Sequence, residues 1–84
     1  MQATTAAAET AAQLVELAAK RFGVDSARLG VDDDFFEALG IDSVQSLDLL
    51  SEVEMTFAVE IPDYELQGVV TFSQLAEKIT ARLV

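Results

Sequence analysis

The chain has 84 residues with no cysteine, no histidine and a net charge of −10. A chain of this length forms one domain, and its composition excludes disulfides, thiolate metal sites and a Ser–His–Asp catalytic arrangement. Because no Lys or Arg lies between Arg28 and Lys78, whereas 12 of the 15 acids lie from Asp32 to Glu77, we expect the domain to repel nucleic acid and anionic membranes and to attract basic protein partners.

The first predicted element is a helix over Glu9–Phe22, after a flexible N-terminus at residues 1–8. We therefore expect a single domain over residues 9–84. The helix should bury positions spaced three to four residues apart, with the stem of Arg21 covering apolar surface while its head stays in water. These positions are Leu14, Leu17, Ala18, Arg21 and Phe22. Gly23 stands where a glycine commonly ends a helix.

A long loop is predicted over Val24–Gly40, with a short helical turn around Phe35–Ala38. Loops of this length are uncommon in small domains and are often functional. Four apolar side chains are expected to fix the loop to the core. They are Phe35, Phe36, Leu39 and Ile41.

A second helix is predicted to begin at Asp42 or Ser43, both good N-cap residues, and to end near Phe57. One face should be apolar and the opposite face polar. The apolar positions are Val44, Leu47, Leu50, Val53 or Glu54, and Phe57, and the polar positions are Gln45, Asp48, Glu52 and possibly Glu54.

The remaining chain predicts two helices beyond Pro62, a residue that prevents simple continuation of the second helix. One is short, from Asp63 as its cap to Gln67, and Gly68 ends it. The last helix follows a Thr71 cap. It covers Phe72–Leu83 with an apolar stripe of Phe72, Leu75, Ala76, Ile79 and Leu83. Val59–Ile61 and Val69–Val70 look strand-like but have no evident partner, so we predict an all-α domain of three main helices and one short helix.

The sequence Leu-Gly-Ile-Asp-Ser-Val at residues 39–44 carries the chemical signal. Gly40 permits a tight turn, and Ser43 then lies at or beside a helix N-terminus, where the helix dipole favours an attached phosphate. Asp42 could present the hydroxyl, hold a metal ion of a partner enzyme, or only cap the helix. Since Ser43 has no neighbouring base, it is expected to be the substrate of another enzyme.

This segment resembles the phosphopantetheine attachment motif of acyl and peptidyl carrier proteins. The resemblance covers about residues 14–83 and includes Phe-Phe-Glu-Ala before the motif, Val-Glu-Ile-Pro after the second helix, and Thr-Phe at the start of the last helix. It implies a small four-helix carrier-protein bundle. It also implies a non-catalytic protein whose Ser43 receives phosphopantetheine from coenzyme A, with Asp42 as the adjacent motif acid.

The resemblance implies several partners. A phosphopantetheinyl transferase, with Mg²⁺ bound mainly on its side, attaches the arm, and the arm's thiol then carries acyl groups as thioesters. A ketosynthase, an acyltransferase or another acyl-processing enzyme would dock through a basic patch.

Four residues are implied as partner contacts: Val44, Leu47, Asp48 and Glu54. Each has a structural alternative. Asp48 and Glu54 could be solvated face residues, and Leu47 is of a residue type found more often in the core.

Some residues differ from the fatty-acid type of carrier. Gln45 stands where an acid is frequent, and residues 64–67 replace a more acidic short helix. Gly40-Ile41 also differs from the Gly-Gly frequent in peptidyl carriers. A polyketide, fatty-acid or related pathway is expected, and these departures favour a specialised pathway such as polyketide synthesis at least as much as primary fatty-acid synthesis. Because the sequence has no signal peptide or membrane-length apolar run and starts with Met, we expect a free-standing, monomeric cytoplasmic carrier.

Of three other interpretations, one remains open, and the sequence argues against the other two. A non-catalytic acidic helical interaction module is the main alternative. A calcium loop at residues 32–34 fails, because the sixth position after Asp32 is Glu37 where an EF-hand needs glycine. An enzyme built from carboxylates, lysines or Tyr64 lacks any sign of a pocket in so short a chain.

Overall fold

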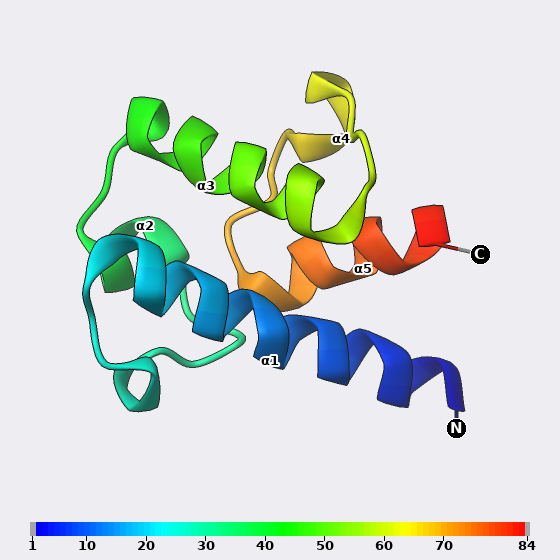
Figure 1. Cartoon of the computed structure of the whole chain (residues 1–84), viewed down its shortest axis with the longest axis horizontal. Coiled ribbons are helices and arrows are strands. Elements are labelled where there is room, and N and C mark those ends of the chain that lie inside the picture. Colours follow the sequence, from blue (N-terminus) through cyan, green and yellow to red (C-terminus); the bar gives the residue numbers. More distant parts are fainter. Residues whose placement is uncertain (1, 84) are drawn as a thin grey trace.

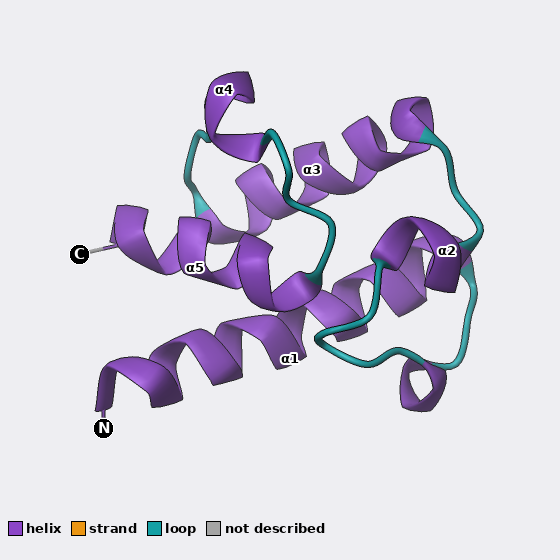
Figure 2. Cartoon of the chain, turned by 180° about the vertical axis from the view of Figure 1, so that it is seen from behind, coloured by secondary structure: helices purple, strands orange, loops and turns teal. Residues whose placement is uncertain are grey.

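The structure, a computed structural model, describes the backbone of residues 2–83 and the side chains of residues 6–82. All the regular secondary structure of the part described is helical, as predicted, and it has no strand (Figures 1 and 2). Its elements are α1 (Gln2–Phe22), η1 (Ser26–Arg28), α2 (Phe35–Leu39), α3 (Ser43–Phe57), α4 (Asp63–Leu66) and α5 (Phe72–Leu83). Helix α2 corresponds to the short turn expected in the long loop.

Helix α1 begins at Gln2 rather than at Glu9. The Ala-rich start has high intrinsic helix propensity, which explains the extension. Among the side chains that the structure describes, the first buried ones are those of Thr10 and Ala11. The buried face is also rotated from the predicted one: Val15 is buried, whereas Arg21 is exposed. The reason is that α1 contacts both α5 and α3, so its core face includes Val15 and Ala19 beside the predicted Leu14 and Ala18.

The connection from α1 to α3 is fixed to the core as expected. Gly23 ends α1 in the left-handed conformation, with φ of 69°. Phe35, Leu39 and Ile41 are buried, and Phe36 is half-buried. The loop is also tied to the start of α5, because the Phe35 N–H donates to the Val70 carbonyl at 2.8 Å. The strand-like run at 69–70 forms no strand, and the isolated bridge beside it joins Asp34 and Thr71.

Two helix starts follow different rules. Thr71 caps α5 as predicted: its Oγ1 accepts from the Gln74 N–H, and the Gln74 side chain accepts from the Thr71 N–H, both at 3.1 Å. The predicted cap of α4 is wrong, because Pro62 holds the cap position without a side-chain hydrogen bond and Asp63 is already helical. A proline suits this place, because its φ is preset and its missing N–H is not needed there.

The core lies where α1, α3 and α5 meet and includes the loop residues described above. Phe72, Ala76 and Ile79 of the predicted α5 stripe are fully buried and Leu75 nearly so. The predicted stripe residue Leu83 has its side chain outside the described residues. None of the helices described is long and apolar enough to cross a membrane.

Candidate functional site

Ser43 is the first residue of α3, and the local sequence explains why the helix begins there. Gly40 ends α2 with φ of 67°, a conformation that glycine adopts without strain. The chain then turns, and Asp42 caps α3: its Oδ1 accepts from the Gln45 N–H at 2.8 Å. The Gln45 Oε1 accepts in return from the Asp42 N–H at 3.2 Å. Of the two predicted cap residues, Asp42 is therefore the one used, and Ser43 keeps its hydroxyl free of that task.

This capping box gives a measurable prediction. Asp42→Ala should lower the free energy of unfolding by about 1 kcal/mol, because the Gln45 N–H loses its acceptor. Asp42→Asn should retain most of that stability, because an amide oxygen also caps helices well. Urea unfolding of both variants checks the prediction. Equal stability losses in the two variants would contradict a capping role.

The variant Asp42→Asn also separates two roles of Asp42. If Asp42→Asn is stable but accepts the expected phosphopantetheine arm more slowly than wild type, the charge of Asp42 acts in loading. If it loads normally, the side chain serves as a cap alone.

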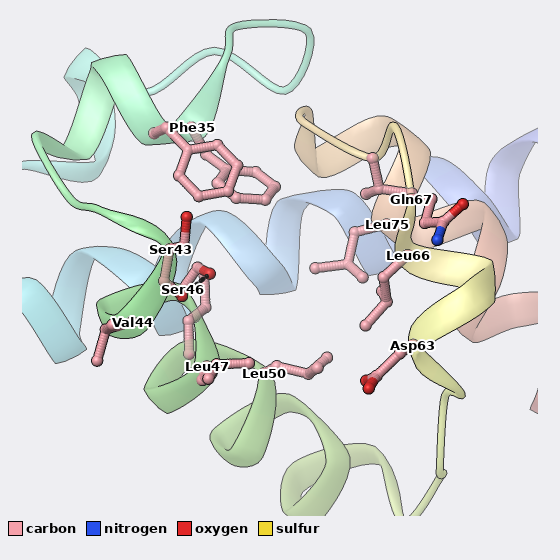
Figure 3. Close-up of a pocket in the computed structure, with 13 residues that line it drawn as sticks. Phe35, Ser43, Val44, Ser46, Leu47, Leu50, Asp63, Leu66, Gln67 and Leu75 are labelled. Carbon is pink, nitrogen blue, oxygen red and sulfur yellow. Dashed lines mark hydrogen bonds between the residues drawn. The ribbon is translucent and has the colours of Figure 1, made fainter.

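Ser43 is exposed, and its hydroxyl points toward the aromatic side chains of α2 (Figure 3). Its carbonyl accepts a hydrogen bond from the Ser46 hydroxyl at 2.6 Å. Neither the Ser43 nor the Val44 backbone N–H donates a hydrogen bond within the described chain. These N–H groups and the helix dipole suit a phosphate at Ser43, although the nearby Asp42 carboxylate opposes it.

A cavity of about 360 Å³ opens beside Ser43, between α2, α3 and α4 (Figure 3). Its lining is mostly apolar and includes Phe35, Phe36, Leu47, Leu50, Leu66, Val69 and Leu75. The two neighbouring phenylalanine rings of α2 lie 4.8 Å apart, and Phe35 also contacts Phe72 of the core with 5.4 Å between ring centres. One wall is therefore anchored to the core. Such a site is suited to a hydrocarbon chain attached near Ser43.

The predicted contact residues of α3 divide into two groups. Val44 and Leu47 are 72% and 59% exposed, so the core interpretation of Leu47 is wrong. Asp48 is exposed on the same helix, with its carboxylate 3.8 Å from the Arg21 guanidinium. The core face of α3 is instead formed by Leu49 and Val53.

Glu54 belongs to the second group, because its side chain is half-buried. Its Oε2 accepts from the Ile61 N–H at 3.0 Å and so holds the loop after α3. The structure therefore brings Val44, Leu47 and Asp48 together on an exposed face and gives Glu54 a structural contact.

One exposed apolar residue of α3 was not predicted as a contact. Met55 is 82% exposed and follows Val44 by eleven positions, which is about three helical turns. The two side chains therefore lie on one stripe with Ser51 between them. The signal was present in the sequence, but it becomes visible only once Leu49 and Val53 identify the buried face.

The acidic run in the long loop serves local structure. Asp34 caps α2 by accepting from the Phe36 and Glu37 N–H groups at 2.9 and 3.3 Å. The Asp33 carboxylate accepts from the Gly30 N–H at 3.0 Å. Over the residues that the structure describes, no group of three or more carboxylates is placed to hold a metal ion.

The comparisons with known proteins match the part of the chain that contains Ser43 and the cavity. A family model described as "Phosphopantetheine attachment site" matches residues 12–79. The acyl carrier protein of Onion yellows phytoplasma (strain OY-M) is 38% identical over 64 residues, which cover 76% of this chain and 84% of that protein. The acyl carrier protein of Rubrobacter xylanophilus is 31% identical over 67 residues, which cover 80% of this chain and 83% of that one.

Proposed function

Because the chain belongs to the phosphopantetheine-binding family of acyl carrier proteins, we propose that Ser43 is the residue that accepts the phosphopantetheine arm. The chain is a carrier and not a catalyst, and its arm supplies the thiol that holds acyl groups as thioesters. A phosphopantetheinyl transferase and acyl-processing enzymes are its partners.

The observation that carries the assignment to Ser43 is its position. Its hydroxyl is exposed at the first residue of α3 and faces the apolar cavity. Ser46, one turn later, is half-buried and donates its hydroxyl to the Ser43 carbonyl. Of the two hydroxyls, only that of Ser43 is open to an incoming enzyme. Intact mass after incubation with coenzyme A, Mg²⁺ and the transferase tests the assignment.

We further propose that the cavity shelters the acyl chain. Its lining is apolar, and burying methylene groups there is favourable by about 0.8 kcal/mol for each group removed from water. The acyl chain belongs to a polyketide, fatty-acid or related biosynthetic pathway. The carrier domain is residues 9–84, supported by packing that begins at Thr10.

For the partner surface, we propose the exposed face of α3 that carries Val44, Leu47, Asp48 and Met55. The net charge of −10 favours partners with a basic patch, such as a ketosynthase or an acyltransferase, over nucleic acid or anionic membrane. Glu54 contributes negative charge at the edge of this face while holding the Ile61 backbone. The carrier acts as a monomer in the cytoplasm, where it meets coenzyme A and these enzymes.

Reversing one charge on this face tests it. Asp48→Lys should slow turnover by a cognate partner about tenfold at low salt, because close charge pairs across interfaces commonly contribute more than 1 kcal/mol. It should change the free energy of unfolding by about 1 kcal/mol or less, since the Arg21 pair is exposed. Partner kinetics at several salt concentrations and urea unfolding supply the two readouts.

The matched control is Asp32→Lys in the exposed loop, which changes the net charge by the same two units. If both variants slow the partner equally, the effect comes from total charge and Asp48 is not a specific contact.

A further inference from the structure

Helix α4 forms one wall of the cavity but is weakly built. It has four residues, none of them buried, and its start has no side-chain cap. It lies between Pro62 and Gly68, with Gly68 in the left-handed conformation at φ of 79°. Short segments with few buried contacts open more easily than the rest of a domain. The position of this wall therefore depends on the few contacts that hold α4.

Those contacts come from two sides of α4. Leu66 is half-buried and packs against the core while lining the cavity, together with Asp63 and Gln67. Glu65 lies between these wall residues, and its carboxylate accepts a hydrogen bond from the Arg82 guanidinium in the last turn of α5. The pair therefore joins the movable wall to a helix of the core, across 17 positions of sequence.

This ion pair differs from the other one in the described chain. The side chains of Glu65 and Arg82 are 28% and 32% exposed, whereas those of Arg21 and Asp48 are 43% and 61% exposed. Lower exposure reduces screening by water and salt, and it also means that less side-chain motion remains. The Glu65–Arg82 pair is therefore the ion pair placed to hold a segment in position.

We propose that Glu65 and Arg82 are positioning residues for the acyl-chain cavity. They hold α4 in the place that closes the cavity, and so determine how well a long acyl chain is shielded from water and reagents. They do not touch the site of arm attachment. The inference rests on the proposed function, in that the sheltered chain is carried near Ser43.

The first test needs no arm. Hydrogen exchange of the backbone amides of residues 63–69 is measured in the unloaded protein for wild type, Glu65→Gln and Arg82→Gln. Exchange should rise about three- to tenfold in each variant. The double variant Glu65→Arg with Arg82→Glu should restore protection. Arg21→Gln removes the other ion pair and should leave these amides unchanged. Unchanged exchange in Glu65→Gln, or no recovery in the double variant, would overturn the proposal.

The second test measures shielding. The same proteins are loaded from octanoyl- or acetyl-coenzyme A, and hydroxylamine is added. Its nitrogen attacks the thioester carbonyl, giving a hydroxamic acid and the free thiol of the arm. Cleavage of the octanoyl form should be several-fold faster in Glu65→Gln than in wild type. The octanoyl chain reaches the cavity, and in this variant the α4 wall that shields it is no longer held in place. Cleavage of the acetyl form, which is too short to reach it, should be unchanged.

The outcomes separate the two levels of inference. Failure of the wild type to load would refute the assignment of Ser43 and, with it, the shielding role. Loading followed by equal cleavage of octanoyl and acetyl forms in wild type would refute the cavity as the acyl site and overturn the proposal. Normal shielding in wild type that Glu65→Gln leaves intact would overturn the positioning role alone.

Discussion

Ser43→Ala is expected to abolish arm loading completely while the protein stays folded. Loading requires the hydroxyl oxygen itself, and alanine has none. The fold should survive because Asp42, and not Ser43, caps α3, and because the Ser43 side chain is exposed. The change in the free energy of unfolding should be within about 0.5 kcal/mol.

Intact mass before and after treatment with coenzyme A, Mg²⁺ and a phosphopantetheinyl transferase gives the result. Wild type should gain the mass of one phosphopantetheine and the variant none. Ser46→Ala is the matched control, since it removes a hydroxyl three residues away and should still load. A folded wild type that gains no mass would leave an acidic helical interaction module as the better interpretation. Loading of Ser43→Ala would place the attachment elsewhere.

The largest expected effect on stability comes from Leu49, which lies two positions after Leu47, a leucine that contributes little to the stability of the fold. Leu49 is 2% exposed in the core, and Leu47 is 59% exposed. Leu49→Ala should lower the free energy of unfolding by about 2–5 kcal/mol, because it leaves a cavity among buried side chains. That is a large part of the roughly 5–15 kcal/mol that stabilises a typical small domain.

Leu47→Ala makes the same chemical change on the exposed face. Its free energy of unfolding should stay within about 0.5 kcal/mol of wild type. Its loaded form should be a poorer substrate for a cognate enzyme, because an apolar contact is lost from the proposed docking face. Urea unfolding and partner kinetics on the two variants form one experiment. Similar stability losses would show that α3 is oriented differently in solution.

Much of the fold follows from local sequence signals. The bounds of α3 and α5, the Gly23 stop and the Thr71 cap were predicted because each depends on residues within one or two turns. The N-terminal limit of α1 was wrong because alanine-rich segments form helix without any apolar periodicity to mark them. The cap of α4 was wrong because proline competes with aspartate for the start of a helix.

The candidate site was likewise predicted in part from local sequence, while the rest of it depends on the tertiary structure. The motif alone indicated Ser43 and a helix N-terminus beside it, because turn and cap chemistry are written into consecutive residues. The choice between Asp42 and Ser43 as the cap required the Gln45 side chain in place. The cavity could not be predicted at all, because its walls come from segments separated by up to 40 residues, from Phe35 to Leu75.

By itself, the sequence determined that this is an all-α carrier with a serine at the start of a helix. Propensity, capping and the attachment motif act over short stretches of chain. Tertiary structure alone decided which face of α3 is buried, since Leu47 and Leu49 are the same residue and periodicity does not say where the partner helices lie. It also decided the pairing of Glu65 with Arg82, because that contact forms only when packing of the core brings α4 beside α5.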